Sequence, residues 1–159
     1  RLKSPLTLYC GFDPTADSLH IGSLQQLLLL RRYQDQGHTP IALLGGGTGM
    51  IGDPRPSSER QLLTLEKIRE NGISIRQQLD KFCLSTGSNA LISLNNYDWL
   101  SQIDLLSFLR DYGKFFNVNY MIAKDTIASR LDSGISFTEF TYTILQAIDF
   151  LYLYKNYKC

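Results

Sequence analysis

The first turn of one predicted helix carries residues that suit anion binding better than helix formation. In the stretch DSLHIGSLQQLLLL, residues 17–30, apolar side chains at helical spacing follow His20, Gly22 and Ser23. Glycine costs about 1 kcal/mol against alanine inside a helix. The free N–H groups at a helix N-terminus attract anions, and a missing side chain lets a flat ring approach. The turn therefore predicts a phosphate site, with an ordinary capping histidine as the alternative.

A second polar group lies on the last predicted helix. Tyr142, Gln146 and Asp149 are four and then three positions apart, which places them on one stripe of a helix with 3.6 residues per turn. The side chains between them are mostly apolar, so a solvent-facing stripe is the less favoured alternative. Because a carboxylate inside a protein needs a partner, the stripe predicts a buried polar binding site.

The loop GGGTGMIGDP, residues 45–54, contains a formal GxGxxG pattern that starts at Gly47. A dinucleotide site would need a helix to begin there, and Pro54 and Pro56 disfavour one. Close approach of backbone to a ligand is the preferred interpretation of these glycines. Asp53, at the end of the loop, would either hold an ammonium group or cap the turn.

The predicted elements alternate between strands and helices. Strands are expected at residues 6–10, 40–44 and 90–94, and helices at residues 19–36, 58–82, 103–112, 124–131 and 137–154. Ser58 is a candidate cap of the second helix. The apolar stretch PIALL suits a strand buried on both faces of a parallel sheet, and the first strand, helix and strand form a βαβ unit. The fold class is therefore α/β, with a parallel sheet flanked by helices.

The composition limits the classes of partner. At 159 residues the chain fits one domain, and its net charge of +1 gives no bulk signal for a polyanion. Cys10, Cys83 and Cys159 form neither a disulfide framework nor a metal motif, which suits a reducing cytosol. No apolar run is long enough to span a bilayer, so we expect a cytoplasmic protein. We interpret His38 as a surface loop residue and Cys83 as a small buried hydrophobe.

Five blocks of the sequence, in the same order, resemble the catalytic domain of the bacterial-type tyrosyl-tRNA synthetases of class I. They are CGFDPTADSLHIG, GGGTGMIGDP, NNYDW, FLRDYGKFFNVNYM and GISFTEFTYTILQAIDF. The resemblance covers nearly the whole chain. It implies a Rossmann-like (HUP-type) fold and the activation of tyrosine with ATP, accompanied by Mg²⁺, before transfer to tRNA(Tyr). No tightly bound cofactor and no metal ligand on the chain is expected.

The resemblance also implies roles for individual residues. The catalytic residues would be His20, Ser23 and Thr15. The ATP-binding residues would be Cys10, Gly11, Asp13, His20, Gly22, Ser23 and Arg60. Tyrosine would be held by Tyr9, Asp53, Asn96, Tyr142, Gln146 and Asp149, with Tyr9 and Asp149 on the phenolic hydroxyl. Because the substrate carboxylate is already a nucleophile, catalysis would consist of positioning and charge stabilisation.

Two departures from the family pattern leave alternatives open. Ser23 stands where the HIGH signature has its second histidine. The chain, residues 1–159, would be a truncated class I catalytic domain, without the GSDQWGN-like block, the KMSKS loop and the anticodon-binding domain. We expect a homodimer through the region from Phe108 to Phe137. The alternatives are another HxGH-type nucleotidyltransferase and a non-catalytic, synthetase-like interaction module.

Overall fold

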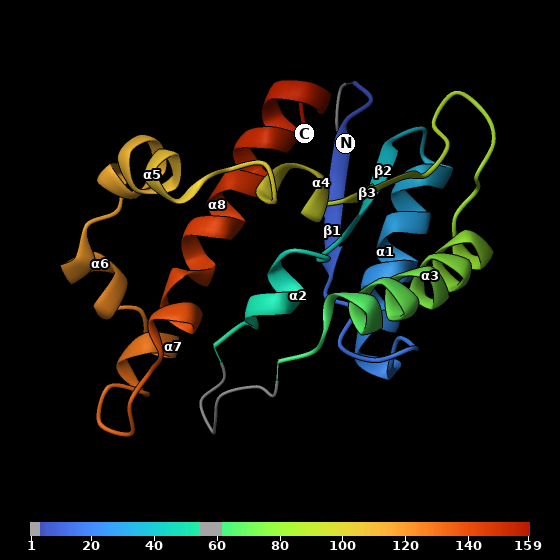
Figure 1. Cartoon of the computed structure of the whole chain (residues 1–159). Helices are drawn as coiled ribbons and strands as arrows, with labels where there is room; N and C mark the ends of the chain where they lie inside the picture. The colour runs from blue at the N-terminus through green and yellow to red at the C-terminus, as the bar shows by residue number, and fades with distance from the viewer. Residues whose placement is uncertain (1–3, 55–61) are drawn as a thin grey trace.

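A parallel sheet forms the centre of the chain in the computed structural model, which describes residues 4–54 and 62–159. Within that part, three strands lie in the order β1–β2–β3 (Figure 1). The strands are β1 (Thr7–Phe12), β2 (Thr39–Leu44) and β3 (Ile92–Asn95). Their last residues pair, Phe12 with Leu44 and Leu44 with Asn95, so the three carboxyl ends meet at one edge. The prediction of an α/β fold with a parallel sheet is confirmed.

The helices connect and cover the strands. In chain order they are α1 (Ile21–Asp35), α2 (Thr48–Ile51), α3 (Leu65–Phe82), α4 (Tyr97–Leu100), α5 (Leu105–Ser107), the π-helical η1 (Phe108–Tyr112), the 3₁₀-helical η2 (Gly113–Phe115), α6 (Val118–Ile122), α7 (Asp125–Ala128) and α8 (Phe137–Tyr157). Figure 1 shows α1 and α3 together on one side of the sheet and the long α8 on the other side. None of the helices in the described ranges is long and apolar enough to cross a membrane.

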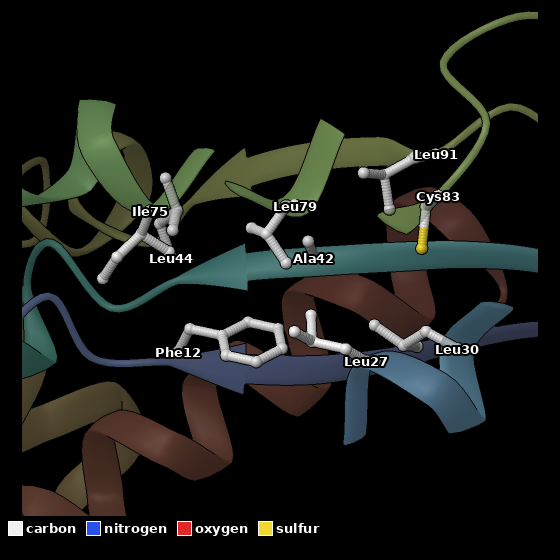
Figure 2. Close-up of a cluster of buried hydrophobic side chains, with 9 residues drawn as sticks. All are labelled: Phe12, Leu27, Leu30, Ala42, Leu44, Ile75, Leu79, Cys83 and Leu91. Carbon is white, nitrogen blue, oxygen red and sulfur yellow. The ribbon is translucent and has the colours of Figure 1, made fainter. Parts of the chain in front are cut away.

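The central strand β2 is apolar from Pro40 to Leu44, and its side chains enter two separate cores. Ala42 and Leu44 belong to a cluster with residues of α1 and α3, among them Leu27 and Leu79 (Figure 2). Ile41 and Leu43 point to the other side. That second cluster contains Trp99, Met121, Ile144, Ile148 and Leu153. Burial of both faces confirms the interpretation of PIALL, and Cys83 is buried in the first cluster as predicted.

The second and third connecting regions differ from their predicted helices. Residues 62–64 are not helical, and α3 begins at Leu65, where the Thr64 hydroxyl accepts a hydrogen bond from the Lys67 N–H. The candidate cap Ser58 lies outside the described residues. The predicted helix 103–112 is present from Leu105 as α5, capped by Asp104, and continues as the π-helical η1 to Tyr112. The predicted helix 124–131 is shortened to α7 (Asp125–Ala128), and Asn117 caps the short α6 before it. A one-turn helix, α2, also forms inside the predicted glycine loop.

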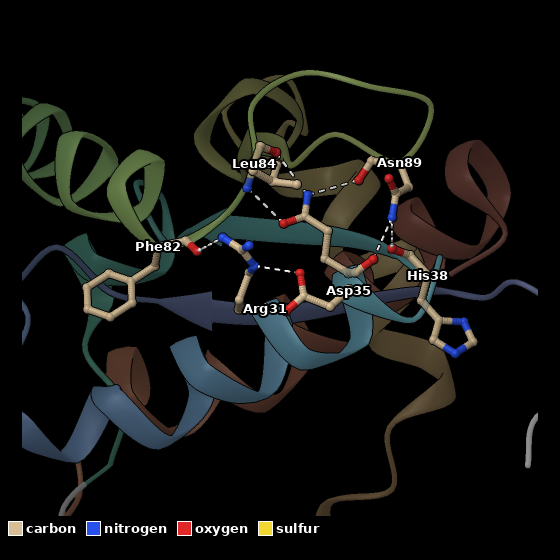
Figure 3. A network of polar contacts seen from close by, with 7 residues as sticks. Arg31, Asp35, His38, Phe82, Leu84 and Asn89 are labelled. Atoms are coloured by element: carbon tan, nitrogen blue, oxygen red, sulfur yellow. Dashed lines mark hydrogen bonds and ion pairs between the residues drawn. The ribbon is translucent and has the colours of Figure 1, made fainter.

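His38 is not a surface residue, and this prediction was wrong. The side chain is 8% exposed, and its Nδ1 accepts a hydrogen bond of 2.9 Å from the backbone N–H of Leu6. The backbone carbonyl of His38 accepts a further bond from the Asn89 amide (Figure 3). The imidazole is buried because it satisfies the backbone just before β1, a contact that the local sequence does not reveal.

Gln34 joins α1 to the segment that leads into β3. Its amide donates to the carbonyls of Leu84 and Asn89 at 2.9 and 3.0 Å, and its oxygen accepts from the Leu84 N–H at 2.8 Å. The Asn89 amide returns a bond of 2.7 Å to the Gln34 carbonyl. Figure 3 shows this network beside the contact of Arg31 with the carbonyl of Phe82. The Gln34 side chain therefore supplies hydrogen-bond partners to backbone groups of the segment 84–89, which is neither helix nor strand.

We expect Gln34→Ala to lower the free energy of unfolding by about 2–4 kcal/mol, because the part-buried backbone groups of Leu84 and Asn89 would lose their partners. Urea unfolding measures this loss. Gln36→Ala is the matched control, since Gln36 is exposed and bonds through its backbone; its effect should stay within about 0.5 kcal/mol. Equal effects of the two variants would contradict the role given to Gln34.

Candidate functional site

A cavity of about 300 Å³ lies between the end of the sheet and α8. Its lining includes all six residues predicted to bind tyrosine, together with Gly11, Phe12, Asp13, Leu43, Gly45 and Thr48. The size lies at the lower end of the range for small-molecule sites. The predicted stripe of Tyr142, Gln146 and Asp149 faces this cavity rather than bulk solvent, with Asp149 innermost and Gln146 exposed at the surface.

Asp149 is buried in the cavity wall and hydrogen-bonded at both of its oxygens. Its side chain is 4% exposed, and its two oxygens accept hydrogen bonds from Trp99 Nε1 at 2.8 Å and Asn96 Nδ2 at 2.9 Å. Burial raises the pKa of Asp149 to about 6, although the two donors act in the opposite direction. The Trp99 ring stacks on Tyr152 with centroids 3.9 Å apart. The carboxylate is therefore ionised at neutral pH and held in a fixed orientation.

Tyr9, on β1, shares the cavity with Asp149. Burial, and next the charge of Asp149, raise the pKa of Tyr9 to about 12, so its hydroxyl keeps its proton at neutral pH. Its ring packs edge-on against Phe150 at 5.9 Å between centroids. Within residues 4–54 and 62–159, no side chain forms a hydrogen bond with the Tyr9 hydroxyl. The lining thus offers a polar ligand group a protonated hydroxyl, which can donate, and an ionised carboxylate, which can accept.

The rest of the lining favours a cation. Three carboxylates, Asp13, Asp53 and Asp149, line the cavity, and no Lys or Arg of the described residues is among its lining. Tyr142 donates a hydrogen bond of 3.2 Å to Asp13, and Asp53 is exposed at the opening. Carboxylates attract an ammonium group, and the phenol and amide groups beside them add directed hydrogen-bonding capacity. The cavity is therefore suited to a small molecule with an ammonium group and a second polar end.

A second cavity of about 220 Å³ adjoins the first at the N-terminus of α1. Gly11, Phe12 and Asp13 line both cavities, and Thr15, His20 and Ser23 line the second. His20 Nδ1 accepts a hydrogen bond of 3.0 Å from the Gly22 N–H, so this histidine is also a helix cap. A side chain at position 22 would meet the His20 ring at 2.7 Å, which explains the glycine locally.

Two of the predicted ATP-binding residues are not part of this lining, and a third is not described by the structure. The half-buried thiol of Cys10 and the exposed Gly22 do not line the second cavity. Arg60 lies outside the described residues. Within the described ranges, no group of three His, Cys, Asp or Glu side chains could hold a metal ion. The described side chains therefore do not form a Mg²⁺ site by themselves.

Two residues that bond to the lining of the first cavity were not predicted from the sequence. Trp99 and Thr48 both bond to groups that line the first cavity. A buried indole N–H normally needs an acceptor, so the single tryptophan could have been matched to a buried carboxylate. Thr48 gave no comparable signal, because its partners lie 35 and 48 positions away.

The whole chain, residues 1–159, matches the family described as tRNA synthetases class I (W and Y). The chain belongs to this family. It is 57% identical to the tyrosine–tRNA ligase of Staphylococcus carnosus over 158 residues, and 57% identical to tyrosine–tRNA ligase 1 of Bacillus cereus over 159 residues. In both comparisons 99% of this chain is covered, but only 38% of the relative.

Solved structures of related proteins share the fold. The mitochondrial tyrosyl-tRNA synthetase of Aspergillus nidulans superposes with a TM-score of 0.81 at 31% identity, over 96% of this chain and 46% of that one. The tyrosyl-tRNA synthetase of Archaeoglobus fulgidus, solved with L-tyrosine, gives 0.69 at 17% identity, over 94% and 43%. The Rossmann-like class I fold and the family predicted from the five sequence blocks are confirmed.

The pKa of Asp149 predicts how stability depends on pH. A carboxyl with a raised native pKa binds more protons in the native state than in the unfolded state between pH 4 and 6, so stability falls as pH rises through this range. Asp149→Asn removes this dependence. We therefore expect the variant to gain about 3 kcal/mol relative to wild type between pH 4 and 7, measured by urea unfolding at both values.

Asp104 supplies the control with the opposite sign. Hydrogen bonds from Ser107 hold the pKa of the Asp104 carboxyl below its usual range. Asp104→Asn should therefore lose stability relative to wild type as pH rises. A difference between wild type and Asp149→Asn that stays constant with pH would contradict the buried carboxylate.

Proposed function

We propose that this chain is the tyrosine- and nucleotide-binding part of a tyrosine–tRNA ligase. The enzyme would join tyrosine to ATP as tyrosyl-adenylate and then transfer tyrosine to tRNA(Tyr). The observation that carries the proposal is that Tyr9 and the buried carboxylate of Asp149 line one acidic cavity, which adjoins the cavity at the N-terminus of α1. Because the chain spans 38% of the relatives' length, the proposal concerns the full-length protein that contains it.

The first cavity would bind tyrosine by its two polar ends. The phenolic hydroxyl would donate to Asp149 and accept from Tyr9, while Asn96 keeps the Asp149 carboxylate in place. Asp53, Tyr142 and Gln146 would bind the ammonium group. Phenylalanine has nearly the same shape but would leave Tyr9 and Asp149 without a hydrogen-bond partner on the ligand. This cost would make its free energy of binding less favourable. The site would thus select tyrosine through the cost of unpaired polar groups.

The second cavity would bind the phosphates of ATP at the first turn of α1. Thr15, His20 and Ser23 would contact the phosphates, with Gly11 and Asp13 between nucleotide and tyrosine. We further propose Cys10 near the ribose, Gly22 under the adenine and Arg60 near the outer phosphates; Mg²⁺ would enter with ATP and supply charge neutralisation there. The free N–H groups and the helix dipole favour the negative charge of phosphate.

The reaction would require no covalent bond between the protein and the substrate. The ionised carboxylate of tyrosine would attack the α-phosphorus, a bond from oxygen to phosphorus would form, and pyrophosphate would leave with the electron pair of the broken bond. No general base is required, because the nucleophile has no proton to lose. The two adjoining cavities would hold the reactants together, so the chain's contribution is positioning and charge stabilisation.

We also propose a homodimer through the region from Phe108 to Phe137. Several large apolar side chains in or next to this region are between 56% and 76% exposed: Leu105, Leu106, Phe115, Val118, Tyr120 and Phe137. An exposed apolar surface of this kind is typical of an interface between proteins. The three free cysteines suit a reducing compartment, which supports the proposal of a cytoplasmic location.

Tyrosine-dependent exchange of pyrophosphate into ATP tests the proposed function in the full-length protein. We expect exchange with tyrosine, and with phenylalanine a kcat/KM at least about 10- to 100-fold lower, from the loss of hydrogen bonds to buried groups. Exchange with another amino acid in place of tyrosine would favour a different nucleotidyltransferase. Absence of exchange with tyrosine would favour the non-catalytic module, which the serine at position 23 also supports.

Ser23→His tests the assignment of the first turn of α1 to phosphate. A serine hydroxyl carries no positive charge and reaches less far than an imidazole. We therefore expect the substitution to raise the rate of tyrosine activation by about 10- to 100-fold, the equivalent of about 1–3 kcal/mol for a charge-assisted hydrogen bond. Pre-steady-state formation of tyrosyl-adenylate measures the rate. An unchanged or lower rate would contradict the placement of residue 23.

A further inference from the structure

Thr48 connects the two ends of the tyrosine cavity by hydrogen bonds. The residue begins α2 and is 4% exposed. Its hydroxyl accepts from Asn96 Nδ2 at 3.0 Å and donates to Asp13 Oδ1 at 2.8 Å. Asn96 Nδ2 also donates to Asp149, and the other oxygen of Asp13 accepts from Tyr142. An unbroken chain therefore runs from the phenol end of the cavity to its ammonium end.

The direction of each bond in this chain is fixed. The backbone N–H of Gly47 donates to Asn96 Oδ1 at 2.8 Å. Because a backbone N–H can only donate, the oxygen of the Asn96 amide must face Gly47 and its nitrogen must face Thr48 and Asp149. The Thr48 hydroxyl must then accept from Asn96, and its single proton remains for Asp13. No member of the chain can reverse without losing a bond.

Gly45 gives independent support for the bond between Thr48 and Asp13. A Cβ at position 45 would overlap the Asp13 carboxylate and come within 2.5 Å of the Thr48 hydroxyl. The glycine therefore leaves the space in which these two side chains meet. The missing side chain at Gly45 therefore makes room for two protein groups, a role that the loop sequence did not predict.

We propose that Thr48 is a positioning residue that couples the binding of the phenol to the binding of the ammonium group. The proposal rests on the proposed function, since it concerns how tyrosine is held. Loss of the hydroxyl would leave a buried N–H of Asn96 without its acceptor and would remove one donor from Asp13 Oδ1. Both ends of the cavity would then lose alignment together, although Thr48 reaches them only through other side chains.

Double-mutant cycles in the full-length protein test this coupling. Asn96→Ala and Tyr142→Phe remove one group at each end, and kcat/KM for tyrosine in pyrophosphate exchange is measured for each single variant and for the pair. We expect the combined effect to differ from the product of the single effects by about fivefold or more, as for residues in one network. In the Thr48→Val background the two effects should multiply within about twofold.

Variants at two positions separate positioning from general loss of structure. Thr48→Ser keeps the hydroxyl and should restore the coupling, whereas Thr48→Ala removes it without the branched shape and replaces Thr48→Val if that variant does not fold. Thr141→Val is the matched control, because the Thr141 hydroxyl bonds, among the residues that the structure describes, only to the Thr138 carbonyl within α8; it should leave the coupling intact. Coupling of equal size with and without the Thr48 hydroxyl would overturn the proposal.

The outcomes for the two proposals are distinct. Absence of exchange in the wild-type protein contradicts the proposed function alone, and the same cycles measured by urea unfolding then still test the hydrogen-bond chain. Exchange in the wild type together with multiplicative effects in the presence of Thr48 contradicts the coupling alone. Exchange together with coupling that disappears in Thr48→Val supports both.

Discussion

The buried carboxylate of Asp149 is the interaction on which the site depends. An ionised carboxylate away from water is unfavourable unless donors surround it, and here an indole N–H and an amide N–H occupy one oxygen each. These two donors come from Trp99 and Asn96, at and beside the short helix α4 that follows β3. The need to satisfy Asp149 therefore ties α8 to the carboxyl edge of the sheet, where the ligand cavity forms.

The sheet edge brings together groups that lie far apart in the sequence. The ends of β1, β2 and β3 are in register, so the segments after them supply Asp13, the glycine loop and Asn96 to the same place. Ligands of open α/β sheets bind at this edge for the same reason. The two cores on either side of β2 fix α1 and α8 against the sheet, and thereby place the first turn of α1 next to the acidic cavity.

Some of this arrangement could be predicted from the sequence and some could not. The stripe of Tyr142, Gln146 and Asp149 follows from helical periodicity alone, and the turn at His20 follows from residue types that oppose helix propensity. Burial of His38 and the bonds of Thr48 depend on residues dozens of positions away, which periodicity cannot detect. Between α4 and α8, the π-helical stretch from Phe108 and the short α6 were not predicted, because an apolar pattern does not show where the hydrogen bonding of a helix changes or where a side chain such as Asn117 caps a new turn.

A structure of the full-length protein crystallised with tyrosine would test the central claim most directly. We expect the phenolic oxygen to lie within hydrogen-bond distance of both Tyr9 Oη and an oxygen of Asp149. The amino nitrogen should lie toward Asp53, Tyr142 and Gln146. Tyrosine bound with its ring in the cavity at the start of α1, or with its amino group against Asp149, would contradict it.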